Sequence, residues 1–196
     1  MKIVHEFASG VLLLRAEIHE DERGFFFESY NQAEFDRFVP NSRFVQDNIS
    51  HSRRNVLRGL HYQIRQPQGK LVRVLSGEIF DVAVDLRRNS GTFGSWDGLQ
   101  LSSRTSEMLW IPPGFAHGFL TLSDFATIQY KATHYYAPHF ERTIQWNDPN
   151  LGINWPLKEA PVLSIKDAAA LSFEGSEVYD WPNQRYATLS EVCPAY

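Results

Sequence analysis

Cysteine is nearly absent from this chain of 196 residues, which contains only Cys193. One thiol can form neither an intramolecular disulfide framework nor a cysteine-based metal cluster, and this usage fits a reducing compartment. An excess of one charge is also lacking, because 19 Lys and Arg residues stand against 23 Asp and Glu residues, for a formal net charge of −4. Without a basic stripe, nucleic-acid binding is not expected, and any bound anion should be small and held locally.

Long hydrophobic runs are missing as well. No stretch approaches the length that crosses a membrane, and the opening residues, MKIVHEF, lack the apolar core of a signal peptide. We therefore expect a cytoplasmic protein without membrane contact. A chain of this size can bury one good core but is too short for a second, so we predict a single domain over residues 1–196.

Short β-branched and aromatic runs, separated by Gly, Pro, Asn and Ser, dominate the chain from Arg43 onward. This spacing is typical of an all-β sandwich or barrel. In the run IFDVAVDL the side chains alternate, which predicts one dry face, with Val82 and Val84, and one polar face, with Asp81 and Asp85.

Two short helical segments are expected. Asn31 can cap a helix over residues 32–39, with Glu34 three residues later as in a capping box. A helical turn is expected near residues 166–171, within a C-terminal segment, residues 157–196, that is richer in Ala, Ser and Pro. We expect this segment to wrap the barrel rather than to form a second core.

His61 is the first candidate for chemistry. In a strand its side chain points opposite to its neighbours and can enter a cavity, and an imidazole near neutrality is a natural general base. Arg58 precedes it by three residues and Lys70 opens the next strand, so both cations could reach the same cavity and hold a phosphate or pyrophosphate. Taken singly, these residues would also fit a core histidine and two solvated surface charges.

His117 follows a tight bend in IPPGFAHGF, where Pro and Gly deliver it to the start of an aromatic strand. In cupins this position often supplies a metal ligand, and the upstream motif normally offers two histidines and a glutamate. Here the upstream residues are His61, Tyr62 and Gln63, so a metal site is poorly supported. His117 is instead expected to bind substrate or to serve a structural role.

Tyr130 and Tyr136 are an even number of positions apart, so both rings would share a face if the strand stayed regular between them. A phenol can act as the general acid that protonates an enolate, and a flat ring can stack on a nucleobase. Ordinary aromatic packing would explain both residues equally well in a chain that is 14% aromatic.

Six ordered motifs carry a resemblance to the nucleotide-sugar epimerases typified by dTDP-4-dehydrorhamnose 3,5-epimerase. They are DERGFFFESY at 21–30, FVQDNISHS at 44–52, VLRGLHYQ at 56–63, KLVRVLSGEIFDVAVDLRRNSGTFG at 70–94, LWIPPGFAHGFLTLSDFATIQYK at 109–131 and YYAPHFERTIQWNDPNLGINWP at 135–156. The resemblance implies a cupin-like jelly-roll β-barrel with short peripheral helices, which works as a homodimer and needs no metal and no cofactor.

The resemblance also implies a role for each site residue. His61 resembles the base that removes the proton beside the ketone of a dTDP-linked 4-keto-6-deoxyhexose, Asp167 its orienting partner, and Tyr130 the acid on the opposite face. Lys70 is the first candidate to stabilise the enolate oxygen. The residues implied in substrate binding are Arg58, Lys70 and His117 on the hexose or phosphates, Glu141 and Lys166 nearby, Gln46, Asp47 and Asn48 in a polar loop, Tyr136 on thymine, and Arg23, Phe26 and Glu28 reaching the nucleotide from the neighbouring subunit.

Several alternatives stay open. Inversion at C3 and C5 would give dTDP-4-dehydro-L-rhamnose, but family members that invert one carbon, or use another nucleotide, keep the same His, Asp and Tyr residues. The motifs therefore do not separate a rhamnose pathway from a secondary-metabolite pathway. A metal-dependent cupin enzyme is a second alternative, and a non-catalytic sugar-nucleotide-binding barrel is a third, which the joint presence of His61, Asp167 and Tyr130 disfavours. Residues 173–196 are not mapped onto the family, and no role is assigned to them.

Overall fold

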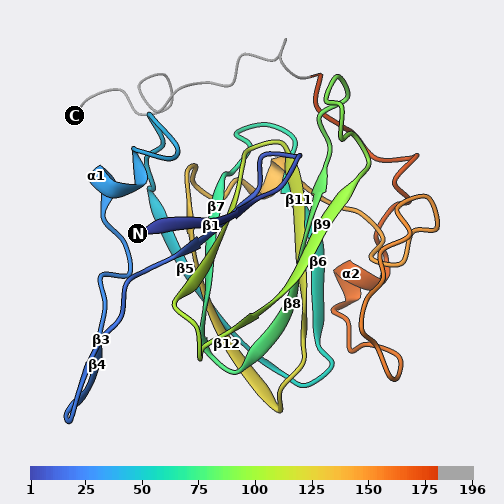
Figure 1. Ribbon diagram of the computed structural model, residues 1–196. Coiled ribbons are helices and arrows are strands. Elements are labelled where there is room, and N and C mark those ends of the chain that lie inside the picture. The colour runs from blue at the N-terminus through green and yellow to red at the C-terminus, as the bar shows by residue number, and fades with distance from the viewer. Residues whose placement is uncertain (181–196) are drawn as a thin grey trace.

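Two antiparallel β-sheets face each other in the computed structural model, which describes residues 1–180 (Figure 1). The six-stranded sheet contains, in spatial order, β1 (Lys2–Glu6), β2 (Leu12–Arg15), β10 (Glu107–Ile111), β7 (Lys70–Ser76), β12 (Phe125–Ala132) and β5 (Gln46–Arg53). The five-stranded sheet contains β13 (Glu141–Thr143), β6 (Leu57–Gln63), β11 (Phe115–Thr121), β8 (Glu78–Asp85) and β9 (Trp96–Ser102). The prediction of an all-β fold is confirmed.

The remaining elements are short and lie at the periphery. They are the hairpin of β3 (His19–Asp21) and β4 (Gly24–Phe26), the helices α1 (Gln32–Phe35) and α2 (Ile165–Ala168), and the 3-10 turn η1 (Pro138–Phe140). The hairpin extends away from both sheets, whereas α2 lies beside β6 (Figure 1).

The alternating run on β8 has both of its faces buried. Val82 and Val84 pack on the outside of the five-stranded sheet, in an apolar cluster with Tyr179. Asp81 and Asp85 point to the opposite face and are also fully buried. The polar face that the sequence predicts is therefore not solvated, because it faces the other sheet.

Three apolar clusters hold the sheets and their coverings together. One lies between the sheets and joins Val72 and Ile128 of the larger sheet to Ala83 and Phe119 of the smaller. Another covers the outside of the five-stranded sheet. The third covers the outside of the six-stranded sheet beneath α1, where Phe35 is fully buried.

The helix α1 begins where the sequence predicts and ends earlier. The side chain of Asn31 accepts hydrogen bonds from the backbone N–H groups of Ala33 and Glu34, as an N-cap residue does. The regular helix stops at Phe35 rather than at Val39, and the chain continues in turns in which the backbone N–H groups of Phe38 and Val39 donate to the carbonyl of Phe35.

The C-terminal segment lies against the outside of the five-stranded sheet over the residues that are described. Val162 bridges Val56, and the hydroxyl of the buried Tyr179 donates to the carbonyl of Gln63 at 2.5 Å. The helical turn predicted near residues 166–171 is α2, which begins and ends slightly earlier. The rest of the segment predicted to wrap the barrel, residues 181–196 with Cys193, lies outside the described residues.

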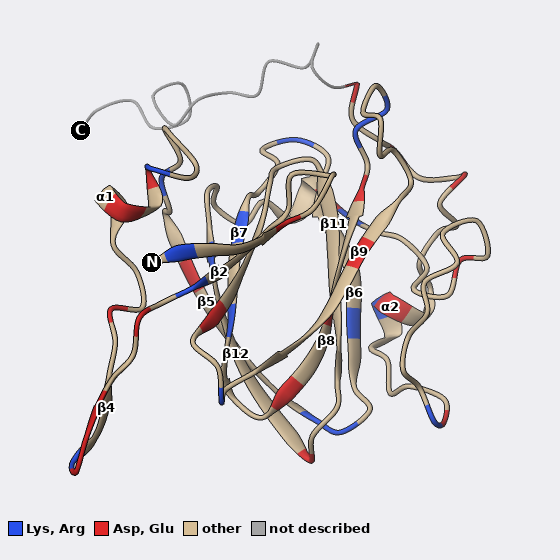
Figure 2. Cartoon of the chain, in the orientation of Figure 1, with Lys and Arg blue, Asp and Glu red and all other residues tan. Residues whose placement is uncertain are grey.

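Charges of both signs are scattered over strands and loops (Figure 2). Acidic side chains are prominent on the hairpin of β3 and β4, and neither sign fills a continuous face in this view. Within residues 1–180, no helix is long and apolar enough to cross a membrane.

Candidate active site

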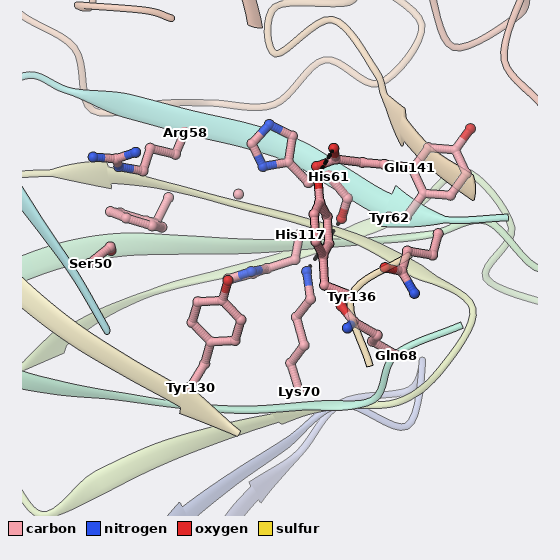
Figure 3. Close-up of a pocket in the computed structure, with 13 residues that line it drawn as sticks. Ser50, Arg58, His61, Tyr62, Gln68, Lys70, His117, Tyr130, Tyr136 and Glu141 are labelled. Carbon is pink, nitrogen blue, oxygen red and sulfur yellow. Dashed lines mark hydrogen bonds between the residues drawn. The ribbon is translucent and has the colours of Figure 1, made fainter. Parts of the chain in front are cut away.

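A cavity of about 190 Å³ lies between the two sheets, and both sheets supply its walls (Figure 3). Arg58 and His61 project into it from the five-stranded sheet, and Lys70 and Tyr130 project from the six-stranded sheet. The other lining residues are Ser50, Tyr62, Gln63, Gln68, His117, Gly118, Phe119, Tyr136 and Glu141. The structure thus brings together the histidines, cations and phenols that the motifs predict for one site.

His61 and Asp167 form a hydrogen-bonded pair at the cavity wall. The distance from Nε2 of His61 to Oδ1 of Asp167 is 2.5 Å, and the Asp167 side chain is 4% exposed. Burial raises the pKa of Asp167, but the hydrogen bonds and charge of His61 and the hydroxyl of Ser164 outweigh it and hold this pKa below its ordinary value. The carboxylate is therefore ionised at neutral pH, which fixes the imidazole proton on Nε2 and leaves Nδ1 as the basic atom.

His117 forms a second pair, with Asp81 of β8. Its Nε2 lies 3.0 Å from both carboxylate oxygens of Asp81, and both side chains are buried. Burial lowers the pKa of His117 although Asp81 opposes the shift, so this imidazole is neutral at neutral pH. Sequence reasoning did not identify Asp81 as a site residue. The sequence did contain a signal for it, because Asp81 is a carboxylate on one face of a strand whose other face is apolar.

Gly59 and Gly118 allow β6 and β11 to approach closely beside the paired histidines His61 and His117. A Cβ atom at Gly59 would lie 2.5 Å from Cα of Gly118, and one at Gly118 would lie 2.8 Å from the carbonyl oxygen of Arg58. Gly59 also has a φ of +128°, which L side chains rarely adopt. Any side chain at either position would push the two strands apart.

Lys70 and Tyr130 face the histidines from the other sheet. Burial lowers the pKa of Lys70 to about 8, against the opposing charges of Asp81 and Glu141. Its Nζ lies 5.8 Å from the centre of the Tyr130 ring. Burial raises the pKa of Tyr130, so its phenol stays protonated and can act as an acid.

The strand β5 supplies polar side chains on alternate residues. The Oγ atom of Ser50 and Nδ2 of Asn48 are buried and have no hydrogen-bond partner among the described residues, which leaves both available to a ligand. Asp47 lies on the opposite face and pairs with Lys131 at 2.9 Å. Because side chains alternate along a strand, Gln46, Asp47 and Asn48 cannot all line one cavity as the sequence predicted. The next inward position after Asn48 is Ser50, which sequence reasoning missed.

Arg58 and Gln46 are held by neighbouring polar groups. Nε of Arg58 donates to the hydroxyl of Ser52 at 3.0 Å. The side chain of Gln46 donates to Oδ1 of Asn48 and accepts from the backbone N–H of Tyr136, each at 2.8 Å. Gln46 therefore supports the loop of Tyr136 rather than lining the cavity itself.

Tyr136 lies at the cavity mouth in a chain of polar contacts. Its hydroxyl donates to Oε2 of Glu141 at 2.7 Å, and Glu141 forms an ion pair with Lys166. Burial raises the pKa of Glu141, but Lys166 and Tyr136 outweigh it and the net pKa is lowered. The strand β12 ends at Ala132, so the regular strand assumed between Tyr130 and Tyr136 does not exist, yet both rings line the cavity.

The three residues predicted to come from a neighbouring subunit lie away from this cavity. Arg23 and Phe26 belong to the β3–β4 hairpin, where Arg23 pairs with Asp21 and Phe26 is 72% exposed. Glu28 accepts a hydrogen bond from Asn31 at 3.1 Å. Within one chain, the hairpin does not reach the cavity that it is expected to serve.

The described part of the chain holds no group of three or more His, Cys, Asp or Glu side chains placed to bind a metal ion. The two histidines at the cavity are each engaged with a different carboxylate. The three-ligand arrangement of a metal-dependent cupin is therefore not formed by residues 1–180.

Comparison with known proteins identifies the family of this chain. The model of the dTDP-4-dehydrorhamnose 3,5-epimerase family matches residues 7–175. The chain belongs to this family. A dTDP-4-dehydrorhamnose 3,5-epimerase of Pseudomonas aeruginosa is 55% identical over 170 residues, which cover 86% of this chain and 94% of the relative.

Solved structures of epimerases have the same fold. The crystal structure of a dTDP-6-deoxy-D-glucose-3,5-epimerase from Legionella pneumophila, in complex with dTDP-4-keto-L-rhamnose, has a TM-score of 0.83 and 50% identity, and covers 85% of this chain and 89% of that one. A 3'-monoepimerase from Streptomyces bikiniensis, in complex with dTDP-quinovose, has a TM-score of 0.78 and 33% identity, and covers 83% of each chain. The cupin-like jelly roll and the family that the six motifs indicate are both confirmed, whereas the individual residue roles stay predictions.

Proposed function

We propose that this protein is a cofactor-independent epimerase that inverts C3 and C5 of dTDP-4-dehydro-6-deoxy-D-glucose to give dTDP-4-dehydro-L-rhamnose. One observation carries the proposal: the His61–Asp167 pair faces Tyr130 across a cavity between the two sheets. Membership in a family whose relatives are named for this reaction supports it.

The chemistry begins with a proton made acidic by the neighbouring ketone. Nδ1 of His61 takes this proton from carbon, and the electron pair of the C–H bond moves into the ketone to form an enolate. Asp167 stabilises the imidazolium that results. The buried ammonium of Lys70 is placed to stabilise the enolate oxygen, an interaction that strengthens only as negative charge develops there.

Inversion requires that the new proton arrive from the other face of the ring. Tyr130 belongs to β12 and His61 to β6, so acid and base come from opposite sheets. Facing sheets pack roughly 10 Å apart, which leaves space for one sugar ring between them. Tyr130 gives its proton to carbon while the enolate becomes a ketone again, and solvent restores both side chains for the second carbon.

The nucleotide end of the substrate is assigned to the cavity mouth. Tyr136 is about half exposed and is held by Glu141, so its ring can stack on thymine without losing a core contact. Arg58 is placed to hold a phosphate through its guanidinium. Lys166 would add positive charge near the same end.

We also propose a homodimer in which one subunit completes the site of the other. The exposed Phe26 and the neighbouring Arg23 lie on a hairpin that leaves its own barrel, which suits a contact with a second copy. Light scattering would test the dimer, and mixed dimers of Arg23→Ala and His61→Asn chains would test the sharing. Two defective chains should restore part of the activity together only if each site uses both subunits.

Solvent-deuterium incorporation into dTDP-4-keto-6-deoxyglucose, read by proton NMR at each carbon, is the decisive test. We expect exchange at C3 and C5 and its loss in His61→Asn. Tyr130→Phe should retain deprotonation but lose inversion, because only the acid is removed. A wild-type protein that exchanges no position in this sugar would rule out the proposed reaction.

The alternative function is that of an epimerase that inverts one carbon. The structural likeness to a 3'-monoepimerase supports this alternative. The same spectra decide between the two, since exchange would then occur at a single carbon. Activity that survives chelation would exclude the metal-dependent alternative. The cytoplasmic location remains a prediction from the sequence, and cell fractionation would check it.

A further inference from the structure

The helical turn α2 presents Asp167 to His61 with little apolar anchoring. Ile165 is 92% exposed, the two alanines that follow Asp167 are also exposed, and Asp167 is the buried residue of the turn. A turn that buries no apolar side chain is not fixed by packing. The direction of the Asp167 carboxylate must therefore depend on polar contacts.

Ser164 makes two of these contacts, both with Asp167. Its Oγ accepts a hydrogen bond from the backbone N–H of Asp167 at 3.1 Å and donates one to Oδ2 at 2.8 Å. The first contact caps the turn, and the second holds the carboxylate oxygen that His61 does not use. One hydroxyl thus fixes both the backbone and the side chain of Asp167.

Lys166 anchors the same turn in a different way. It pairs with Glu141, which belongs to β13 and not to the histidine pair. This contact restrains where the turn lies, but it does not restrain rotation of the Asp167 side chain. The rotation is restrained by Ser164 and by His61 itself.

We propose that Ser164 is a positioning residue for the catalytic base, because its hydroxyl orients Asp167 and thereby keeps the proton of His61 on Nε2. The inference rests on the proposed function, in which Nδ1 of His61 must be free to accept a proton from carbon. Without the hydroxyl, the Asp167 carboxylate turns away for part of the time and the imidazole populates its other tautomer. That tautomer carries its proton on the atom that should act as the base.

The test compares Ser164→Ala with Ser164→Thr and with a matched serine, Ser172→Ala. Ser172 is exposed and caps a nearby turn through the backbone N–H of Gly175 at 3.2 Å, without touching the histidine pair. Ser164 is exposed too, so the added methyl group of threonine can point to solvent. Circular dichroism and thermal unfolding would establish that each variant is folded.

Two measurements are made on each protein. We expect kcat of Ser164→Ala to fall by about 10- to 100-fold with KM nearly unchanged, as misplacement of a catalytic group does, while Ser164→Thr and Ser172→Ala stay near wild type. In protein labelled with ¹⁵N-histidine, the His61 ring signals, assigned by their loss in His61→Asn, should move from the Nε2–H tautomer toward a mixture in Ser164→Ala alone.

Two results would overturn the role of Ser164: kcat and ring signals of Ser164→Ala that match those of Ser172→Ala, or a threonine variant as impaired as the alanine variant. The ring signals need no substrate. A wild-type protein without deuterium exchange would therefore refute the proposed reaction, while the ring signals would still decide whether Ser164 controls the tautomer.

Discussion

Two histidine–aspartate pairs lie next to each other in this protein, and their surroundings differ. His61 and His117 are direct partners in the β6–β11 ladder. The His61 side chain is 29% exposed and its carboxylate comes from a turn outside the sheets, whereas His117 is 7% exposed and its carboxylate comes from the adjacent strand. Residue types alone therefore do not make a base. Both imidazoles line the cavity, but that of His61 is the more exposed and can exchange a proton with solvent.

The largest expected effect is a difference in kcat between variants of the two histidines. His61→Asn should lower kcat by about 10²- to 10⁴-fold, the usual contribution of a general base, with little change in KM. His117→Asn should affect KM and stability more than kcat, because its imidazole is neutral and buried. Steady-state kinetics on both variants checks this, and equal losses in kcat would remove the distinction.

Substitution of the two carboxylates, Asp167 and Asp81, should also affect different properties of the protein. Asp167→Asn should lower kcat by about 10²-fold, because the imidazole loses its orienting partner, and should cost less unfolding free energy than Asp81→Asn, because its partner His61 is 29% exposed. Asp81→Asn should cost roughly 1–3 kcal/mol of unfolding free energy, the penalty for disturbing a buried hydrogen bond. Kinetics and urea unfolding on the pair provide the measurement, and a reversed order would contradict the assignment.

The charge of Lys70 gives a smaller and pH-dependent effect. With a pKa of about 8, its ammonium is lost as pH rises through this value, so kcat/KM should fall on the alkaline side. Asp81 and Glu141 raise this pKa and Lys166 lowers it; Asp81→Asn should therefore move the fall to lower pH. Asp47→Asn, on the outer face, is the control and should leave the pH profile unchanged.

The smallest expected effect is the pH dependence of stability that His117 causes. Its folded pKa lies below the ordinary 6.5, so on acidification the unfolded chain takes up this proton first. Stability is then lost as pH falls below about 6.5 toward the folded pKa. The wild type should lose more unfolding free energy than His117→Asn between pH 7.5 and 5.5 in urea titrations.

Much of the fold follows from local patterns, and the exceptions have physical causes. The alternation in β8 identifies two faces, but it does not reveal that the polar face meets a second sheet, which is why Asp81 was overlooked. Asn31 marks the start of α1 because a cap is a local interaction. Its end depends on the residues that follow, which the capping pattern does not include.

The site depends more heavily on contacts between distant positions. His61 and Asp167 are 106 residues apart in the chain, and no spacing rule joins them, so only the resemblance to a family paired them. Ser50 was missed although it lies two positions beyond Asn48 on the same inward face. The alternation of side chains along the strand would have been sufficient to predict that Ser50 faces the cavity.

The contact between Gly59 and Gly118 limits how the sequence of this barrel can diverge. Neither residue offers a side chain to a substrate, yet the spacing of the two histidine pairs depends on both. In a library selected for activity on a different sugar, replacements should therefore accumulate at lining residues such as Ser50 and Gln68 while Gly59 and Gly118 stay fixed. Adaptation of this barrel to new substrates is expected to proceed through its polar lining, around a backbone junction that admits no substitution.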